Sequence, residues 1–215
     1  DHKMVRRQEK HRLNQSLPNH LANGETSMTR LTRHTVETAP EASKDMLAQT
    51  EKTFGFAPGL YQVMAGAPQL FKTYGAIHQA FQKTSFNARE QTVVWQTINV
   101  EHECTYCVPA HTALAAMMNV DPALNETLRN EAPLNDTKLE ALRTFTLVVV
   151  RNRGHVTQAD LDAFYAAGYA EQQVLEVILG VAQKVLSNYT NHIAQTPVDA
   201  AFTQFTWARS SSEAA

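Results

Sequence analysis

The stretch EHECTYCVPAH, residues 101–111, contains both cysteines of the 215-residue chain, Cys104 and Cys107. The two are spaced C-x-x-C, and His111 follows the second cysteine by four positions. The sequence has no G-x-G-x-x-G, Walker A, H-E-x-x-H or G-x-S-x-G pattern that would indicate another chemistry. The predictions of fold and function therefore both build on this segment.

A buried helix is predicted immediately before the segment. Asn87 and Glu90 have the spacing of a capping box, and the apolar run that follows continues to about Glu101. The run is rich in β-branched residues, so a buried strand is the alternative, but the cap and the length favour a helix. This helix must end before Cys104, because a chain reversal is needed to bury the apolar faces on both sides.

The second helix begins within the motif and continues as an Ala- and Met-rich segment, residues 110–118. Thr105 is its expected N-cap, which places Cys107 in the first turn, where free N–H groups and the helix dipole favour a thiolate. His111 lies one turn further on the same face and can take the thiol proton. Cys104, one turn earlier, is placed to attack an oxidised Cys107. This is the pattern of an attacking thiol, its base and a resolving thiol.

Helical periodicity continues through most of the chain, and no segment shows strand alternation between hairpin turns. Helices are expected over residues 40–53, 58–65, 68–83, 87–101, 110–118, a short stretch from 122, 136–154, 157–168, 171–195 and a short C-terminal piece around 202–207. The predicted fold class is all-α, with one domain over residues 28–207 that carries an N-terminal helical arm. Residues 208–215 are expected to be a polar tail.

Residues 1–27 are polar and basic, and no apolar stretch follows them, so they do not form a secretory signal. We interpret them as a disordered tail, an upstream extension or an expression remnant. Two cysteines do not make a disulfide framework of the secreted kind, so a C-x-x-C pair indicates redox or metal chemistry in a reducing compartment. A cytoplasmic location is the expectation.

Composition limits the partners. Hydrophobic residues make up 43% of the chain, enough for a core, but no run of 18 apolar residues is present to span a membrane. The net charge is −2, and no basic stripe with interleaved aromatic residues occurs. Neither a nucleic acid nor a membrane is therefore expected as a partner.

Two other interpretations of the motif stay open beside the redox one. The cysteines could be buried structural thiols, or they could join His111 as three ligands of a zinc ion. A fourth ligand could then come from Glu101, His102 or His192. No second Cys or His pair stands out, so a redox dithiol with no metal and no cofactor is the favoured interpretation.

The motif and two later segments resemble a known family. The pattern C-x-Y-C-x-x-x-H after an apolar helix is similar to the active-site motif of the carboxymuconolactone decarboxylase superfamily, in its alkyl hydroperoxidase D-like (AhpD-like) peroxidase branch. The segments Ala166-Ala167-Gly168-Tyr169 and Asn188-Tyr189-Thr190-Asn191-His192 also fit, and the similarity covers roughly residues 40–207.

The resemblance implies an AhpD-like helical bundle, assembly into dimers, trimers or hexamers, and a peroxiredoxin-type thiol peroxidase with an antioxidant role. By this similarity, Cys107 reacts with a small hydroperoxide, Cys104 resolves the product and His111 relays the proton. An external dithiol, thioredoxin-like or lipoyl reductant would reduce the disulfide. A non-catalytic helical binding or assembly protein of the same family is the alternative.

The chain departs from the family pattern at one position. The family places a glutamate twelve residues before the first cysteine, where this chain has Thr92. Glu90 should face elsewhere by the helical period and serve the cap of Asn87. Glu101 is the candidate to replace the missing carboxylate behind His111. Without such a carboxylate the thiolate should form less readily.

The remaining polar and aromatic residues of interest have plainer expected roles. His78 is expected to be an interior or interface histidine, and Asn188 and His192 to form a structural hydrogen-bonded pair or to line the thiol pocket. The C-terminal aromatic residues are expected to dock on apolar surface or to support assembly, namely Phe202, Phe205 and Trp207.

Overall fold

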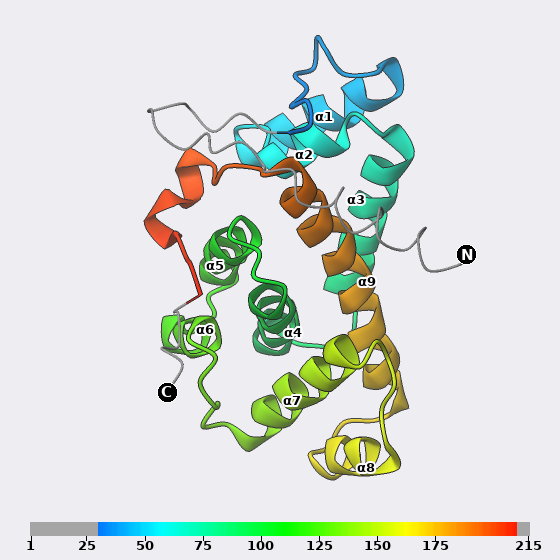
Figure 1. Cartoon of the computed structure of the whole chain (residues 1–215), viewed down its shortest axis with the longest axis vertical. Coiled ribbons are helices and arrows are strands. Elements are labelled where there is room, and N and C mark those ends of the chain that lie inside the picture. The colour runs from blue at the N-terminus through cyan, green and yellow to red at the C-terminus, as the bar shows by residue number, and fades with distance from the viewer. Residues whose placement is uncertain (1–29, 210–215) are drawn as a thin grey trace, which may run out of the picture.

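The computed structural model describes residues 30–209 and contains ten helices and no strand in that range (Figure 1). The all-α prediction is therefore confirmed. The helices are α1 Glu41–Phe54, α2 Gly59–Met64, α3 Pro68–Gln82, α4 Ala88–Glu101, α5 Cys107–Met117, α6 Pro122–Arg129, α7 Thr137–Arg151, α8 Gln158–Ala166, α9 Glu171–Ala194 and the 3-10 helix η3 Ala200–Phe205. The expectation for residues 1–27 lies outside the described residues, as does the tail beyond Arg209. No helix in the described part is long and apolar enough to cross a membrane.

Helix α4 lies at the centre of the bundle, between α5, α6, α7 and α9 (Figure 1). Every residue from Glu90 to Val100 is buried, so a helix rather than a strand fills the core. The predicted capping box is present: the Glu90 N–H donates to Asn87 Oδ1, and the Asn87 N–H donates to Glu90 Oε2, both at 3.0 Å. Glu90 therefore serves the cap, as predicted.

Buried amides on α4 hold α5 in place. Gln96 Nε2 donates to the carbonyl of Val108 at 3.2 Å and to Asn125 Oδ1 at 2.8 Å. Asn99 Nδ2 donates to Gln96 Oε1 at 3.0 Å and to the carbonyl of Cys107 at 3.4 Å. Because buried polar groups are costly without partners, this network fixes the position of the first turn of α5 against α4.

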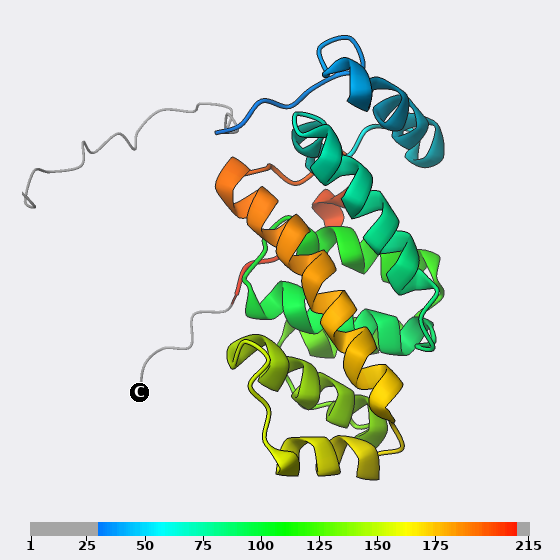
Figure 2. The same ribbon diagram turned by 90° about the vertical axis from the view of Figure 1, so that its right-hand side faces the viewer.

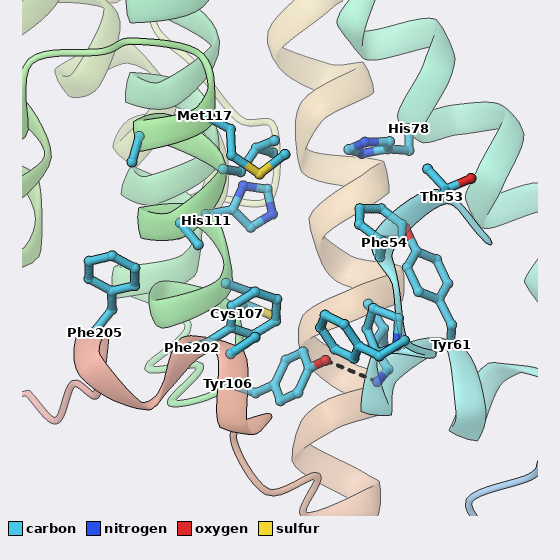
Figure 3. A pocket seen from close by; sticks show the side chains of 18 of the residues that line it. Thr53, Phe54, Tyr61, His78, Tyr106, Cys107, His111, Met117, Phe202 and Phe205 are labelled. Atoms are coloured by element: carbon cyan, nitrogen blue, oxygen red, sulfur yellow. Dashed lines mark hydrogen bonds between the residues drawn. The ribbon is translucent and has the colours of Figure 1, made fainter. Parts of the chain in front are cut away.

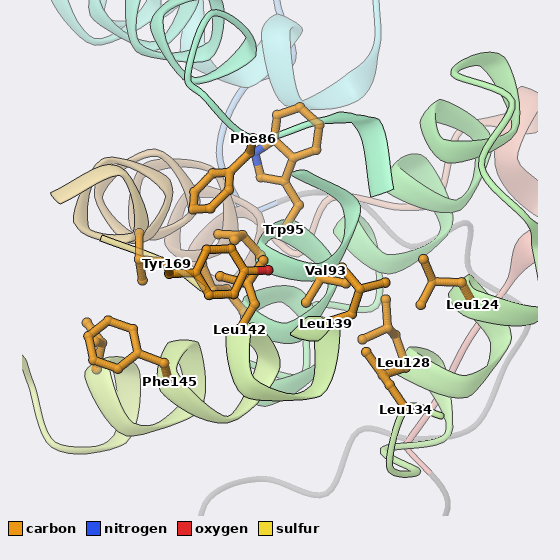
Figure 4. Packing of buried hydrophobic residues seen from close by; sticks show 14 of the residues in the cluster. Phe86, Val93, Trp95, Leu124, Leu128, Leu134, Leu139, Leu142, Phe145 and Tyr169 are labelled. Carbon is orange, nitrogen blue, oxygen red and sulfur yellow. The ribbon is translucent and has the colours of Figure 1, made fainter. Parts of the chain in front are cut away.

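Two apolar clusters flank the motif. The larger one joins α4, α7, α8 and α9 (Figure 4). Within it Phe164 stacks between Phe145 and Tyr169, at 4.3 and 4.5 Å between ring centroids. The second cluster is built by α1, α2 and α3 and includes both cysteines, Cys104 and Cys107. The dithiol therefore lies where the N-terminal helices meet the central bundle.

The C-terminal aromatic residues dock on apolar surface, as predicted. The alternative, that Phe202, Phe205 and Trp207 are exposed and support assembly, is wrong, because none of the three is exposed. Trp207 is buried against Val100 and Val108, and its Nε1 donates to the carbonyl of Arg129 at 3.0 Å. Phe202 is half-buried and packs edge-on against Phe56 at 5.9 Å between centroids. Docking succeeds because the chain after α9 folds back along α5 (Figure 1).

Candidate active site

The turn between α4 and α5 is a Schellman motif that brings the thiols together. Glu103 has a left-handed φ of 54°, its N–H donates to the Val100 carbonyl at 2.9 Å, and the Cys104 N–H donates to the Asn99 carbonyl at 2.9 Å. The chain reverses at this point, as the two apolar faces require. Cys104 therefore lies directly before the first turn of α5.

The expected N-cap at Thr105 is wrong by one residue, since Tyr106 precedes α5 and makes no side-chain cap bond. Its hydroxyl instead donates to Asp199 at 2.6 Å and accepts the Leu60 N–H at 3.2 Å. The Cys107 N–H donates to Cys104 Sγ at 3.2 Å, so a thiol occupies the place of a capping oxygen. The prediction that Cys107 lies in the first turn of the helix is confirmed.

The two free thiols are buried but differ in ionisation. Burial opposes the ionisation of Cys107, yet hydrogen bonding with Cys104, the charge of Lys184 and the Asn191 amide lower its pKa to about 7. Asn191 Nδ2 lies 3.2 Å from Cys107 Sγ. Burial first, and then hydrogen bonding with Cys107 and its negative charge, raise the pKa of Cys104. Cys107 is therefore the thiol that ionises first.

His111 contacts a lysine. Its Nε2 lies 2.8 Å from Nζ of the fully buried Lys184, and its Nδ1 is buried with no hydrogen-bond partner in the described part of the chain. The ring lies 5.0 Å from that of Trp95. Burial, the charge of Lys184 and that of His78 hold the pKa of His111 well below its usual value. The imidazole is therefore neutral at neutral pH.

The expectation that Glu101 supports His111 is wrong. The Glu101 carboxylate forms two bonds to Arg151 on α7, at 2.9 and 2.8 Å, because the last turn of α4 presents it to that helix. Thr92, at the family's acid position, is buried and donates to the Ala88 carbonyl at 2.9 Å. Among the described residues, neither ring nitrogen of His111 bonds to a carboxylate.

Helix α9 supplies functional side chains that the sequence reasoning missed. Gln183 receives a bond from Trp95 Nε1 at 2.8 Å and lies 2.8 Å from His78 Nδ1 through its amide nitrogen. Lys184 and Asn191 contact His111 and Cys107 as described above. The sequence offered little signal, because Lys184 lies within the longest predicted helix, residues 171–195, but off its apolar stripe, and a lysine outside an apolar stripe normally faces solvent.

The predictions for His78 and Asn188 had different outcomes. His78 is an interior histidine, stacked 5.7 Å from the Trp95 ring, and it also lines the cavity described below. Asn188 donates to Asn99 at 3.1 Å rather than pairing with His192. His192 is exposed and its ring stacks on Tyr189 at 6.5 Å. The Asn188–His192 pair is therefore not formed.

A cavity of about 480 Å³ leads to Cys107 and His111 (Figure 3). Cys104 does not line it. Figure 3 shows Phe202 and Phe205 on the side of η3 and Phe54 and Tyr61 on the opposite side. Aromatic residues make up much of the wall: Phe54, Phe56, Tyr61, Tyr74, Tyr106, Phe202 and Phe205. The cavity can hold an apolar molecule against the ionisable thiol.

The side chains suggested as zinc ligands do not come together as a set in the structure. Within residues 30–209 no group of three or more His, Cys, Asp and Glu side chains is close enough to hold a metal ion. Glu101, one suggested fourth ligand, is committed to Arg151. What the site contains is an ionisable thiol, a second thiol behind it, a neutral imidazole and a buried amine.

Comparison with solved structures shows the AhpD-like fold at low sequence identity. A peroxidase-related protein with an alkylhydroperoxidase AhpD core from Ralstonia eutropha JMP134 matches with a TM-score of 0.73 and 19% identity, covering 83% of this chain and 96% of that one. A peroxidase-related protein from Silicibacter sp. TM1040 matches with a TM-score of 0.70 and 16% identity, over 83% and 97% of the two chains.

The debrominase Bmp8 shares the same fold. A cysteine-to-alanine variant in complex with 2,3,4-tribromopyrrole matches with a TM-score of 0.64 and 15% identity, over 82% of this chain and 95% of that one. By sequence, the chain matches no protein family and no curated protein. The fold is therefore shared by proteins described as peroxidase-related and by a debrominase.

Proposed function

We propose that the protein is a thiol-dependent peroxidase that reduces organic hydroperoxides through Cys107 and Cys104. The observation that carries the proposal is the asymmetry of the dithiol. The cysteine with a pKa lowered to about 7 lines an apolar cavity, and the cysteine with the raised pKa lies behind it. A dithiol kept only for structure would need neither property.

The reaction balances with the groups present and one external reductant. The Cys107 thiolate attacks the terminal oxygen of the hydroperoxide, the O–O bond breaks, and the departing alkoxide takes up one proton, which His111 relays from its neighbour at Nε2 so that the imidazole stays neutral. The sulfenic acid on Cys107 is then attacked by Cys104, which forms the disulfide and releases water. An external dithiol reduces the disulfide by exchange and becomes a disulfide itself.

The cavity walls favour a hydroperoxide with an apolar body over hydrogen peroxide. Hydrogen peroxide has no apolar surface to bury, whereas an aromatic ring would bury most of its surface against Phe54, Tyr61 and Phe202. Cumene hydroperoxide is therefore the probe of choice. It combines a ring of suitable size with the reactive O–O bond.

The test is to mix reduced protein with cumene hydroperoxide and to count free thiols over time. Both thiols should be lost together in the wild type. Cys107→Ser should lose turnover, and Cys104→Ser should stop at a sulfenic acid that a dimedone probe detects. Survival of both thiols in a folded protein would contradict the proposal, and unchanged turnover in Cys107→Ser would indicate another site.

Reductive dehalogenation of an aromatic ring is a second candidate. The aromatic cavity beside the thiol and the fold shared with a tribromopyrrole-bound debrominase favour it. In that reaction the ring exchanges a halogen for hydrogen, halide is released, and the dithiol becomes a disulfide. Halide release from 2,3,4-tribromopyrrole in the absence of peroxide would support this candidate over the peroxidase.

A further inference from the structure

Lys184 is a fully buried amine with an unusual set of neighbours. It lies in the middle of α9, its side chain is 0% exposed, and its hydrogen-bond partner is His111 Nε2 at 2.8 Å. None of the ion pairs within residues 30–209 includes it. A buried ammonium without a counter-charge costs several kcal/mol, so the site must supply an anion or keep the amine neutral.

The groups that face Lys184 include one ready source of negative charge. Its charge acts on the histidines of the site, namely His78, His102 and His111, and on the thiols of Cys104 and Cys107. Histidines cannot become anions in this range, and Cys104 resists ionisation. Burial lowers the pKa of Lys184, while the two cysteines raise it, Cys107 more than Cys104. Cys107 and Lys184 also line the same cavity, together with His111, which leaves the Cys107 thiolate as the available counter-charge.

We propose that Lys184 is the counter-ion and the proton source of the dithiol, in place of a carboxylate. Its ammonium stabilises the Cys107 thiolate in the reduced protein and passes one proton through His111 to the departing alkoxide. This assignment rests on the proposed peroxidase function. The group that contacts His111 is then a positively charged ammonium, where a negatively charged carboxylate was expected.

The geometry gives the proton a direct path. An ammonium can only donate, so Nε2 of His111 accepts from Lys184 and the ring proton is on Nδ1. That Nδ1 has no partner within the described part of the chain, and the ring lines the cavity. When the alkoxide takes the Nδ1 proton, Lys184 replaces it at Nε2. The imidazole stays neutral before and after the step.

The charge balance over the cycle follows from this path. In the reduced protein Cys107 is a thiolate and Lys184 an ammonium. Oxidation by one hydroperoxide yields the disulfide, the alcohol and water, and it leaves Lys184 as a neutral amine, with no proton taken from solvent. Reduction by an external dithiol then returns one proton to Cys104 and one to Lys184.

The first experiment measures the ionisation of Cys107 without any peroxide. The thiolate absorbance is titrated in the wild type, Lys184→Met and the control Lys138→Met, whose lysine is half exposed and pairs with Glu90 on α4. Methionine matches lysine in length and suits a buried position. In Lys184→Met the midpoint should rise by about one pH unit or more, an approximately tenfold loss of thiolate. Lys138→Met should titrate as the wild type does.

The second experiment needs no variant and covers the case in which Lys184→Met fails to fold. Wild-type protein in weak buffer, about one pH unit above the Cys107 midpoint, is oxidised with one equivalent of cumene hydroperoxide while an indicator dye reports protons. The proposal expects no net proton uptake. Uptake of one proton per disulfide would mean that Lys184 kept its proton and would overturn the proposal.

The outcomes separate this inference from the peroxidase proposal. If the wild type loses both thiols to peroxide but Lys184→Met titrates unchanged, the peroxidase stands and Lys184 has no such role. If peroxide leaves the thiols intact while Lys184→Met raises the midpoint, the counter-ion role stands and the peroxidase proposal fails.

Discussion

At the scale of single residues, the environment decides the chemistry of the dithiol. Cys104 and Cys107 are three positions apart in the same turn, yet the pKa of one is raised and that of the other is lowered. Burial raises the pKa of both thiols. The difference arises because hydrogen bonding with Cys104, the charge of Lys184 and the Asn191 amide lower the pKa of Cys107, whereas hydrogen bonding with Cys107 and its negative charge raise that of Cys104 further. An attacking thiol and a resolving thiol need this division, since one must ionise and the other must keep its proton until needed.

His78 should make the protein sensitive to acid. Burial, followed by the charge of Lys184, lowers its pKa from 6.5 to about 4, while Trp95 and Tyr74 stack on its ring and Gln183 bonds to it. Between pH 6.5 and about 4 the unfolded chain binds a proton on His78 that the folded protein does not bind. The free energy of unfolding is therefore unaffected above pH 6.5 and decreases as the pH falls from 6.5 toward 4. The loss is on the order of 3 kcal/mol.

Urea denaturation of the reduced protein near pH 7 and near pH 4.5 tests this expectation. His78→Gln should lose less stability between these two conditions than the wild type. The control His155→Gln changes an exposed histidine and should follow the wild type. If the wild type and His78→Gln lose the same free energy of unfolding between the two pH values, the assignment to His78 is contradicted.

At the scale of the element, α9 has a buried face that is polar beside the dithiol and an exposed face that carries several large apolar side chains. Its buried face presents Gln183, Lys184, Ser187, Asn188 and Asn191 toward α4 and the dithiol, at helical spacing. Its outer face exposes apolar residues along most of its length, namely Leu175, Ile178, Tyr189 and Ile193. The helix therefore supplies the polar half of the active site, and only part of its apolar stripe packs into the core.

Gly180 lets α9 approach its neighbours closely. A Cβ at this position would lie 2.7 Å from both Phe81 Cε2 and Val94 Cγ1, which are held by the core. Gly180→Ala should therefore lower the free energy of unfolding by about 1–3 kcal/mol through overpacking, although alanine is the better helix former.

Gly75→Ala in α3 is the matched control, because a Cβ there meets nothing within 4 Å. This variant should gain about 0.5–1 kcal/mol from helix propensity. Denaturant titration of both variants measures whether each substitution raises or lowers the free energy of unfolding. Stabilisation by Gly180→Ala would show that the α9 contact can relax at no cost.

At the scale of the whole molecule, the exposed face of α9 is the best-supported place for self-association. Figure 2 shows α9 running across the face turned toward the viewer. Leu175 is 65% exposed and Ile193 61% exposed, and between them Ile178, Ala182 and Tyr189 are exposed, so that the spacings along the stripe are three, four, seven and four residues. Monomeric proteins rarely expose an apolar stripe of this kind, and the spacing suits the same helix of a second copy.

The homo-oligomer implied by the resemblance stays a prediction, and this surface makes it specific. Ile178→Glu should convert the assembly to a monomer of 24.0 kDa in light scattering, because a charge would have to be buried in the seam. Gln79→Glu adds the same charge at an exposed position of α3 and should leave the assembly intact. A wild type that is already monomeric at high concentration would contradict the prediction.

The sequence by itself determined what depends on neighbours within one or two helical turns. The all-α class, the capping box at Asn87, the placement of Cys107 in a first turn and the end of α4 before Cys104 all follow from local spacing and backbone chemistry. The AhpD-like resemblance drew on the same short motif. The tertiary structure agrees with each of these predictions.

Only the tertiary structure decided which group stands behind His111. Glu101 is ten residues away in the sequence but bonds to Arg151, whereas Lys184 is 73 residues away and bonds to the imidazole. A helix fixes which residues share a face, but the partner of that face depends on how distant helices pack. The charge at the centre of the site is therefore set by the packing of α9 on α4 and α5.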